Sequence, residues 1–212
     1  YSKRDWDRPV RDSKVGMLPP KLAQIMINLA GLKQGTGIFD PFCGNGVIMQ
    51  EALLAGHDTF GSDISPDMVE ATQKNLDWLN DNYELATQYS VELADATRLG
   101  RLPENSIIVT EGYLGTPTTR PLSPAEISSR RQPVEDIYEK FLKNTAQLME
   151  SGQQMVISFP AWQSFGGLIH LKVIDRIEQM GYTFKQCSGQ NTLVYRRENQ
   201  FVGREIAVLV RK

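Results

Sequence analysis

The chain has 212 residues, of which 41% are hydrophobic and 23% are charged, and its formal net charge is −2. This is the composition of an ordinary soluble globular domain with a sizeable core. The net charge excludes a domain that binds polyelectrolytes over its whole surface, so any nucleic-acid surface is a local patch. No apolar run is long enough to span a bilayer. The two cysteines, Cys43 and Cys187, match no metal spacing. We therefore expect reduced thiols, no metal, no membrane contact and a cytoplasmic location.

Helical and strand-like segments alternate along the chain. Residues 1–15 are charged, and we interpret them as a linker from an upstream domain, with residues 16–212 forming one domain. The sequence predicts helices over residues 19–30, 47–55, 65–80, 134–149 and 168–180. It predicts strands at residues 38–39, 59–62, 89–93, 106–110 and 154–159, and three more in the tail at residues 182–186, 192–196 and 205–210.

This alternation predicts a Rossmann-like, doubly wound α/β fold. Its sheet should be mostly parallel, with the last strand inserted antiparallel. The polar, proline-containing stretch before residue 134 is predicted to be a loop over the carboxyl edge of the sheet. Ligands of such sheets bind outside the carboxyl ends of the strands, where the strand order reverses.

A glycine-containing loop follows the first predicted strand. Asp40 ends that strand, and Pro41-Phe42-Cys43-Gly44-Asn45-Gly46 leads directly into a helix. Gly44 and Gly46 let a ligand approach the backbone, and the start of the helix presents N–H groups and positive dipole. These donors suit the carboxylate of S-adenosylmethionine (SAM), and Asp40 suits its ammonium group.

Two further acids follow the next two strands. Asp63 is placed to accept both ribose hydroxyls, and Asp95 to accept the adenine amino group, to which the Ala96 backbone adds a donor. Met17 and Leu18 are predicted to pack against the cofactor or the next helix. The predicted cofactor-binding residues are therefore Met17, Leu18, Asp40, Phe42, Cys43, Gly44, Asn45, Gly46, Asp63, Ile64, Asp95 and Ala96.

A dinucleotide-dependent dehydrogenase is the alternative reading of such a loop. Its fingerprint is G-x-G-x-x-G, whereas Gly44-Asn45-Gly46-Val47-Ile48-Met49 lacks the third glycine. Asp40 would also repel a pyrophosphate. The loop and the acids Asp63 and Asp95, each after a separate strand, together favour SAM.

Two segments carry a resemblance to a known family. The segment from Phe39 to Gly46 resembles motif I of the nucleic-acid amino-methyltransferases. The segment from Arg8 to Ala23, which reads RPVRDSKVGMLPPKLA, is similar to the one before motif I in the THUMP-associated tRNA guanosine-N2 methyltransferases. The resemblance implies methyl transfer from SAM to the exocyclic amine of a guanosine in tRNA. It also implies a THUMP-like RNA-binding domain before residue 1.

The loop after the fourth predicted strand departs from the Asp-Pro-Pro-Tyr of that family. Here the chain reads Thr110-Glu111-Gly112-Tyr113-Leu114-Gly115, which keeps an acid and a tyrosine but neither proline. An acceptor for an amine N–H would help to localise the nitrogen lone pair. We predict Glu111 as that acceptor, with the Gly112 carbonyl as an alternative, and Tyr113 as a stacking partner for the target base.

The residues that would contact RNA are less sharply marked. We predict phosphate contacts by Arg8, Arg11 and Lys14 near the N-terminus and by Arg196 and Arg197 near the last hairpin. Alternatives for the N-terminal group are a solvated linker or, for Arg11 and Lys14, a place at the cofactor pocket. Arg130, Arg131 and Arg204 are weaker candidates for phosphate contacts. Trp162 and Phe165 are candidates for the base pocket or the core. Two other functions stay open: a DNA adenine or cytosine amino-methyltransferase, and a SAM-binding domain without activity.

Overall fold

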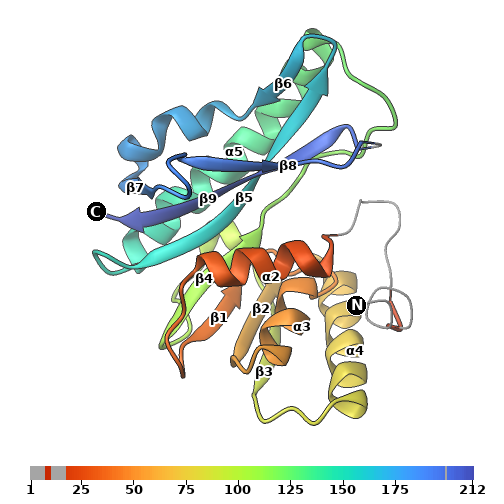
Figure 1. Ribbon diagram of the computed structural model, residues 1–212, viewed down its shortest axis with the longest axis vertical. Coiled ribbons are helices and arrows are strands. Elements are labelled where there is room, and N and C mark those ends of the chain that lie inside the picture. The colour runs from red at the N-terminus through yellow and green to blue at the C-terminus, as the bar shows by residue number, and fades with distance from the viewer. Residues whose placement is uncertain (1–7, 11–17, 199) are drawn as a thin grey trace. The chain divides into compact units, whose positions relative to one another are not determined.

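The computed structural model describes residues 8–10, 18–198 and 200–212 (Figure 1). These residues belong to two compact units, which join in the sequence between Thr110 and Glu111. Each unit contains strands and helices, which are described separately below. In the described part of the chain, no helix combines the length and the apolar character that crossing a membrane requires.

The first unit alternates helices and strands as predicted. Its elements are α2 (Pro20–Leu29), β1 (Gly37–Asp40), α3 (Val47–Leu54), β2 (Thr59–Asp63), α4 (Pro66–Asn82), β3 (Tyr89–Leu93), the short 3-10 helix η1 (Ala96–Arg98) and β4 (Ser106–Glu111). The last residue of β4 begins the second unit. Pro20 and Pro66 stand in the first turns of α2 and α4, where a missing N–H costs nothing.

The strands of the first unit are parallel, in the order β3-β2-β1-β4. Ile38 of β1 pairs with Thr59 on one side and with Ile107 on the other. The chain thus moves outward from β1 in both directions, so the strand order reverses beside β1. Helices α3 and α4 pack on these strands (Figure 1), and a buried cluster joins them: Cys43, Met49, Leu53, Leu76 and Leu79.

The second unit contains one long helix and an antiparallel sheet. Its elements are α5 (Pro124–Leu148), β5 (Gln154–Ser164), β6 (Gly167–His170), the 3-10 helix η2 (Lys172–Met180), β7 (Tyr182–Lys185), β8 (Thr192–Tyr195) and β9 (Val202–Arg211). Strand β9 lies between β5 and β7, antiparallel to both, because Val208 pairs with Val156 and with Lys185. The predicted antiparallel insertion of the last strand is confirmed.

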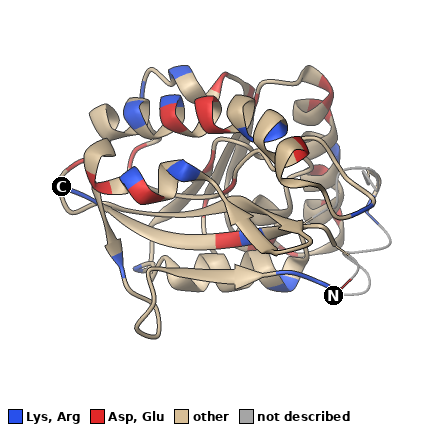
Figure 2. Ribbon diagram, turned by 90° about the horizontal axis from the view of Figure 1, so that it is seen from above, with Lys and Arg blue, Asp and Glu red and all other residues tan. Residues whose placement is uncertain are grey.

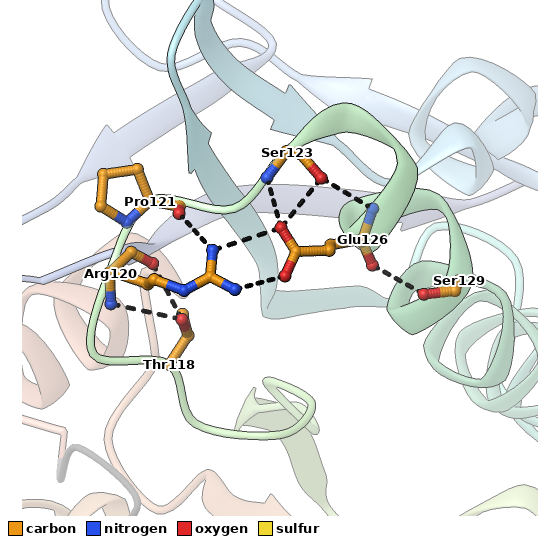
Figure 3. A network of polar contacts seen from close by, with 6 residues as sticks. All are labelled: Thr118, Arg120, Pro121, Ser123, Glu126 and Ser129. Atoms are coloured by element: carbon orange, nitrogen blue, oxygen red, sulfur yellow. Dashed lines mark hydrogen bonds and ion pairs between the residues drawn. The ribbon is translucent and has the colours of Figure 1, made fainter.

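Helix α5 begins ten residues before the predicted start at residue 134, at Pro124. The reason is a capping box, in which Ser123 Oγ accepts from the Glu126 N–H at 3.3 Å and the Glu126 carboxylate accepts from the Ser123 N–H at 2.9 Å (Figure 3). Pro133, predicted to lie in a loop, is inside the helix. The predicted loop is present up to Ser123, and only its continuation over residues 124–133 was wrong.

The helix predicted over residues 168–180 is also wrong in its first part. The chain there forms a hairpin, in which Ser164 pairs with Gly167 at the tip and Ala161 pairs with His170. Gly167 adopts φ +122°, which a residue with a side chain rarely tolerates. The 3-10 helix η2 begins only at Lys172, where the Glu135 carboxylate accepts from the first backbone N–H groups.

We expect Ser123→Ala to destabilise the second unit. The substitution removes the hydroxyl that caps α5, and loss of such a cap costs about 0.5–2 kcal/mol. Urea unfolding measures the change. Ser128→Ala is the matched control, because Ser128 is exposed within the same helix and alanine is favourable there. Equal stability losses for the two variants would show that the cap contributes nothing.

The capping box should also give a pH-dependent contribution to stability. The Arg120 guanidinium and the Ser123 donors lower the pKa of Glu126 to about 2, against about 4.3 for an unfolded chain. A lowered folded-state pKa stabilises the fold above the unfolded value, and that stabilisation is lost as the pH falls toward 2. The difference in unfolding free energy between wild type and Glu126→Gln should therefore be constant above about pH 5 and shrink below about pH 4. A difference that is the same at every pH would contradict this.

Candidate functional site

Three aspartates stand at one edge of the parallel sheet. Asp40 is the last residue of β1 and Asp63 is the last residue of β2, while Asp95 follows β3 and caps η1. Because the three strands run in the same direction, their carboxyl ends meet at this edge. The structure therefore brings together the acids that the sequence singled out, beside the strand where the order reverses.

The carboxylate of Asp63 holds two loops at once. Its Oδ2 accepts from the Gly44 N–H at 3.0 Å, and its Oδ1 accepts from the Ser65 N–H at 2.9 Å. Gly44 belongs to the loop after β1, and Ser65 precedes α4. Each carboxylate oxygen has a second lone pair, so Asp63 can still accept from a ligand hydroxyl.

Asp40 is buried and is tied to the next strand. Its Oδ1 accepts from the Thr110 hydroxyl at 2.6 Å and from the Phe42 N–H at 3.2 Å. Asp40 is only 2% exposed. Asp40 thus fixes the start of the loop after β1 against the end of β4.

A second layer of side chains supports the same loop from α4. Asn75 is fully buried, and its Nδ2 donates to the carbonyl oxygens of Asn45 at 3.0 Å and of Val10 at 3.1 Å. The Val10 N–H donates back to Asn75 Oδ1 at 3.0 Å. Thr72, one turn earlier, donates its hydroxyl to the Gly44 carbonyl. The short described segment 8–10 is therefore joined to the loop through α4.

Gly46 is required where it stands. It has φ +76°, and a Cβ there would lie 2.8 Å from Thr72 Cγ2. Gln50, on the next turn of α3, donates to the Gly46 carbonyl at 3.2 Å.

Burial and the negative charges of Asp40 and Asp63 raise the pKa of the Cys43 thiol. The thiol is thus neutral at physiological pH, and its surroundings do not favour a nucleophilic cysteine.

Apolar side chains lie exposed beside the acids. Ile64, directly after Asp63, is 70% exposed, and Leu93, which pairs with Asp63 in the sheet, is 59% exposed. At the third strand end, Asp95 Oδ1 accepts from the Thr97 N–H at 2.8 Å and from its hydroxyl at 2.7 Å. A carboxylate flanked by exposed apolar groups suits a nucleoside, which has hydroxyls on its sugar and a flat apolar face on its base.

Ala96 and Leu18 are buried, at 4% and 5% exposure. The predicted roles of Ala96 and Leu18 at the cofactor stay predictions. Met17 lies outside the described residues, as do Arg11 and Lys14, so their predicted roles stay predictions.

The loop after β4 is held within the second unit. Glu111 Oε1 lies 2.6 Å from Arg204 Nε on β9, in an ion pair whose arginine is 1% exposed. Burial raises the pKa of Glu111, and the Arg204 charge opposes that rise. Tyr113 is 44% exposed, which leaves its ring open to a partner. The predicted roles of Glu111 and Tyr113 stay predictions.

The other residues predicted to contact nucleic acid are in different surroundings. Arg8 is 3% exposed, whereas Arg196 and Arg197 are exposed. Trp162 is 1% exposed and belongs to the core, and Phe165 at the tip of the β5–β6 hairpin is 84% exposed. Acidic and basic residues are interspersed along the helices (Figure 2), so charge alone does not mark a phosphate-binding surface.

Sequence reasoning missed Thr72, Asn75 and Thr110, and it offered Arg204 as a phosphate contact, whereas the structure buries Arg204 in an ion pair with Glu111. A signal was present for the two in α4. The buried residues of that helix are Ala71, Thr72, Asn75, Leu76 and Leu79. Two polar side chains inside an otherwise apolar stripe imply buried hydrogen-bond partners. Thr110 and Arg204 gave no such signal, because each is one polar residue in a strand.

A family model described as RMKL-like, methyltransferase domain (UPF0020) matches residues 8–188. The chain belongs to this methyltransferase family. The match includes the segment 8–10, the loop after β1, all three aspartates and the loop after β4, whereas Arg204 and the rest of β9 lie outside it.

Two curated relatives of this methyltransferase domain are named tRNA (guanine(10)-N2)-dimethyltransferase. The one from Methanothermobacter thermautotrophicus is 35% identical over 155 residues, which are 73% of this chain and 42% of that protein. The one from Pyrococcus abyssi is 31% identical over 185 residues, which are 84% of this chain and 48% of that protein. The chain thus spans a little less than half the length of these relatives.

Solved structures show the same methyltransferase fold. TrmN from Thermus thermophilus has a TM-score of 0.66 at 18% identity, covering 100% of this chain and 53% of that one. Magnesium protoporphyrin IX methyltransferase from Synechocystis with bound SAM has a TM-score of 0.60 at 19% identity, covering 90% of this chain and 79% of that one. The predicted Rossmann-like methyltransferase fold is confirmed.

We expect Asn75→Ala to destabilise the first unit strongly. The substitution leaves the N–H and the carbonyl of Val10 without the partner that Asn75 provides, and it leaves the Asn45 carbonyl with Gln50 Nε2 alone. Each buried unsatisfied group costs about 1–3 kcal/mol. Asn80→Ala is the matched control, since Asn80 is exposed in the same helix. The free energy of unfolding in urea checks both variants. Similar values for the two would mean that the buried amide does not hold the loop.

Proposed function

We propose that the protein is a SAM-dependent methyltransferase that acts on RNA and that its target is the exocyclic N2 of a guanosine in tRNA. The observation that carries the proposal is the glycine loop after β1, which is held by Asp63 in a domain of a methyltransferase family. The names of the two archaeal relatives support guanosine N2 and tRNA as the substrate. The similar segment from Arg8 to Ala23 supports the same substrate.

The residues at the strand ends fit SAM by their chemistry. Asp63 can accept from ribose hydroxyls, and Ile64 and Leu93 offer exposed apolar surface for adenine. The loop from Gly44 to Gly46 leaves room for a ligand at the backbone. In addition, Asn45 Oδ1 is buried without a hydrogen-bond partner among the described residues, and a ligand N–H can satisfy such an acceptor. Asp40 supplies negative charge for the ammonium group.

SAM supplies a methyl group on a positively charged sulfur. The chain's own tasks are to align the amine and to exclude water, since the departing thioether is neutral. In the transfer the amine nitrogen forms a bond to the methyl carbon, the carbon–sulfur bond breaks with its electron pair on sulfur, and an amine proton leaves to an acceptor. We propose Glu111 as that acceptor and as the hydrogen-bond partner of the amine N–H before transfer. The Gly112 carbonyl is the alternative hydrogen-bond partner, and in that case the proton leaves to solvent. Tyr113 is the proposed base-stacking residue.

We also propose which partners the protein contacts and where in the cell it is located. Arg196 and Arg197 are proposed phosphate contacts, because they are exposed on the connection between β8 and β9. A THUMP-like RNA-binding domain in the same full-length protein and a cytoplasmic location belong to the proposal as well. A second candidate function, SAM binding without transfer, is favoured by one observation, the lack of both prolines in the loop after Thr110.

The substrate is tested by transfer of labelled methyl groups from SAM to total tRNA and, separately, to DNA. We expect label in tRNA, released on digestion as N2-methylated guanosine, and none in DNA. Label in DNA alone would favour the amino-methyltransferase reading. Calorimetric binding of SAM without transfer to either nucleic acid would favour the second candidate. Tight binding of a dinucleotide with no heat from SAM would overturn the cofactor assignment.

The cofactor assignment makes a sharper prediction at Ile64. Because Ile64 is largely exposed in the folded chain, Ile64→Ser should leave the melting temperature nearly unchanged. Burying such a side chain against a ligand contributes about 1.5–3 kcal/mol, so the SAM dissociation constant should rise about tenfold or more. Val194→Ser is the control, because Val194 is 48% exposed on β8 in the other unit. Equal SAM affinity in the two variants would remove Ile64 from the site.

A further inference from the structure

The loop from Glu111 to Gly115 has a defined conformation in spite of its missing prolines. A Cβ on Gly112 would lie 2.3 Å from the Tyr138 hydroxyl oxygen, so this glycine is pressed onto α5. Gly115 has φ +82°, and a Cβ there would lie 3.2 Å from Val134 Cγ2. The loop therefore lies closely against α5. This packing restricts the backbone conformation of the loop, as the rings of two prolines would.

The platform beneath the loop is itself fixed. Tyr138 is fully buried, and its hydroxyl donates to the Ser158 carbonyl on β5 at 2.9 Å. Its ring centre lies 5.0 Å from that of Phe159. Gly112 thus rests on a side chain that cannot easily move, since both the polar and the aromatic part of Tyr138 have partners in the core.

At the start of the loop, Glu111 is bonded to a buried arginine. Arg204 Nε donates to Glu111 Oε1 at 2.6 Å, and Arg204 Nη1 donates to Gln200 Oε1 at 3.2 Å. The arginine side chain is 2% exposed and that of Glu111 is 18% exposed. Among the residues that the structure describes, no second partner of Glu111 is found. Its Oε2 therefore keeps its capacity to accept a hydrogen bond.

Arg204 is held in place by the sheet. It pairs with Pro160 of β5 on one side and with Tyr195 of β8 on the other, so its backbone is fixed from both edges of β9. A guanidinium on such a strand presents its donors in one direction and gives a bonded carboxylate little freedom.

We propose that Arg204 is a positioning residue for methyl transfer, which holds the Glu111 carboxylate ionised and fixed as the acceptor for the exocyclic amine of the substrate. This inference rests on the proposed function. Arg204 lies on β9, outside the glycine loop and outside the residues that the family model matches. A protonated Glu111 would present a hydroxyl donor in place of an acceptor oxygen, so ionisation is a condition of the role.

The electrostatic surroundings make that ionisation depend on Arg204. The ionisable groups that face Glu111 within its unit are Arg204 of β9 and the phenol of Tyr138 on α5. Burial raises the pKa of Glu111 and Arg204 lowers it. Burial and the charge of Glu111 raise the pKa of Tyr138 well above its usual value, so this phenol stays neutral. Without Arg204 only the effect of burial would remain, and Glu111 would take up a proton at higher pH.

The test compares wild type, Arg204→Gln, Arg204→Lys and Glu111→Gln as full chains, in two measurements. The first is carbon NMR of the glutamate carboxyl groups against pH, in which the Glu111 signal is assigned by its loss in Glu111→Gln. We expect Glu111 to titrate at a clearly higher pH in Arg204→Gln than in wild type, and near the wild-type pH in Arg204→Lys. The same titration in wild type and Arg204→Gln would overturn the proposal, whatever the enzyme methylates.

The second measurement is the pH dependence of methyl transfer to tRNA. For Arg204→Gln we expect a loss of about tenfold or more near pH 6.5, partly recovered as the pH rises, because general-base partners contribute about 10²–10⁴-fold when correctly ionised. Arg204→Lys should keep the wild-type shape of the profile. A loss that is equal at every pH, with unchanged SAM affinity, would count against a role through Glu111 ionisation.

Arg211→Gln is the matched control for both measurements. Arg211 stands on the same strand, but it donates to backbone carbonyls, those of Ala146 at 2.7 Å and Gly181 at 2.8 Å. Its loss should lower the melting temperature and leave the titration of Glu111 and the shape of the pH profile unchanged.

If Arg204→Gln fails to fold, Arg204→Lys and Glu111→Gln still test the proposal. The proposal requires that Arg204→Lys keep the wild-type pH profile of methyl transfer. It also requires that Glu111→Gln lose the fall in rate that wild type shows at low pH. Wild type that binds SAM but methylates no RNA would refute the proposed function, and the NMR titration would still report on Arg204.

Discussion

The arrangement of the first unit depends on two hydrogen bonds to one carboxylate. Asp63 ends β2, yet it accepts from the backbone of the loop after β1 and from the residue that opens α4. Hydrogen bonds to a charged group are stronger than those between neutral groups. A loop that contains two glycines in left-handed conformation would otherwise sample many conformations. The carboxylate selects one of them, and the buried amide of Asn75 supports the same loop from below.

These hydrogen bonds give Asp63 a structural role that its position in the sequence does not show. The sequence indicated an acid about twenty residues after the glycine loop, as a ligand group. In the structure the same acid also supports the loop that we propose to bind the other end of the ligand. Structural support and proposed binding thus share one side chain, and a substitution there should impair both.

The sequence predicted the parallel part of the fold well. The strands of the first unit alternate with helices, of which α2 and α4 have proline in the first turn and α3 follows a glycine, and these are local signals. The continuation of the loop to residue 133 and the helix from residue 168 were mispredicted, because a capping box and strand pairing decide the structure there. Pro133 indicated a break, but the capping box at Ser123 had already begun the helix. The hairpin at Gly167 depends on pairing with β5, which no local pattern reveals.

The candidate site shows the same division between local and distant information. Asp40, the glycine loop and Asp63 follow one another in sequence order at the ends of strands, so a pattern exposes them. The ion pair of Glu111 joins residues that are 93 positions apart. Only the insertion of β9 between β5 and β7 brings Arg204 there. Composition and spacing carry no record of such a contact.

Strand β9 has a further consequence, which follows from the alternation of side chains along a strand. Arg204 reaches Glu111, while the next residue, Glu205, contacts His170 and accepts from Thr192 at 2.7 Å. A displacement of the strand by one position would exchange these two directions and set one glutamate against another in a buried place. Inside the strand, a single inserted or deleted residue would therefore reverse the charge on both faces at once, which makes this short stretch intolerant of any change in length.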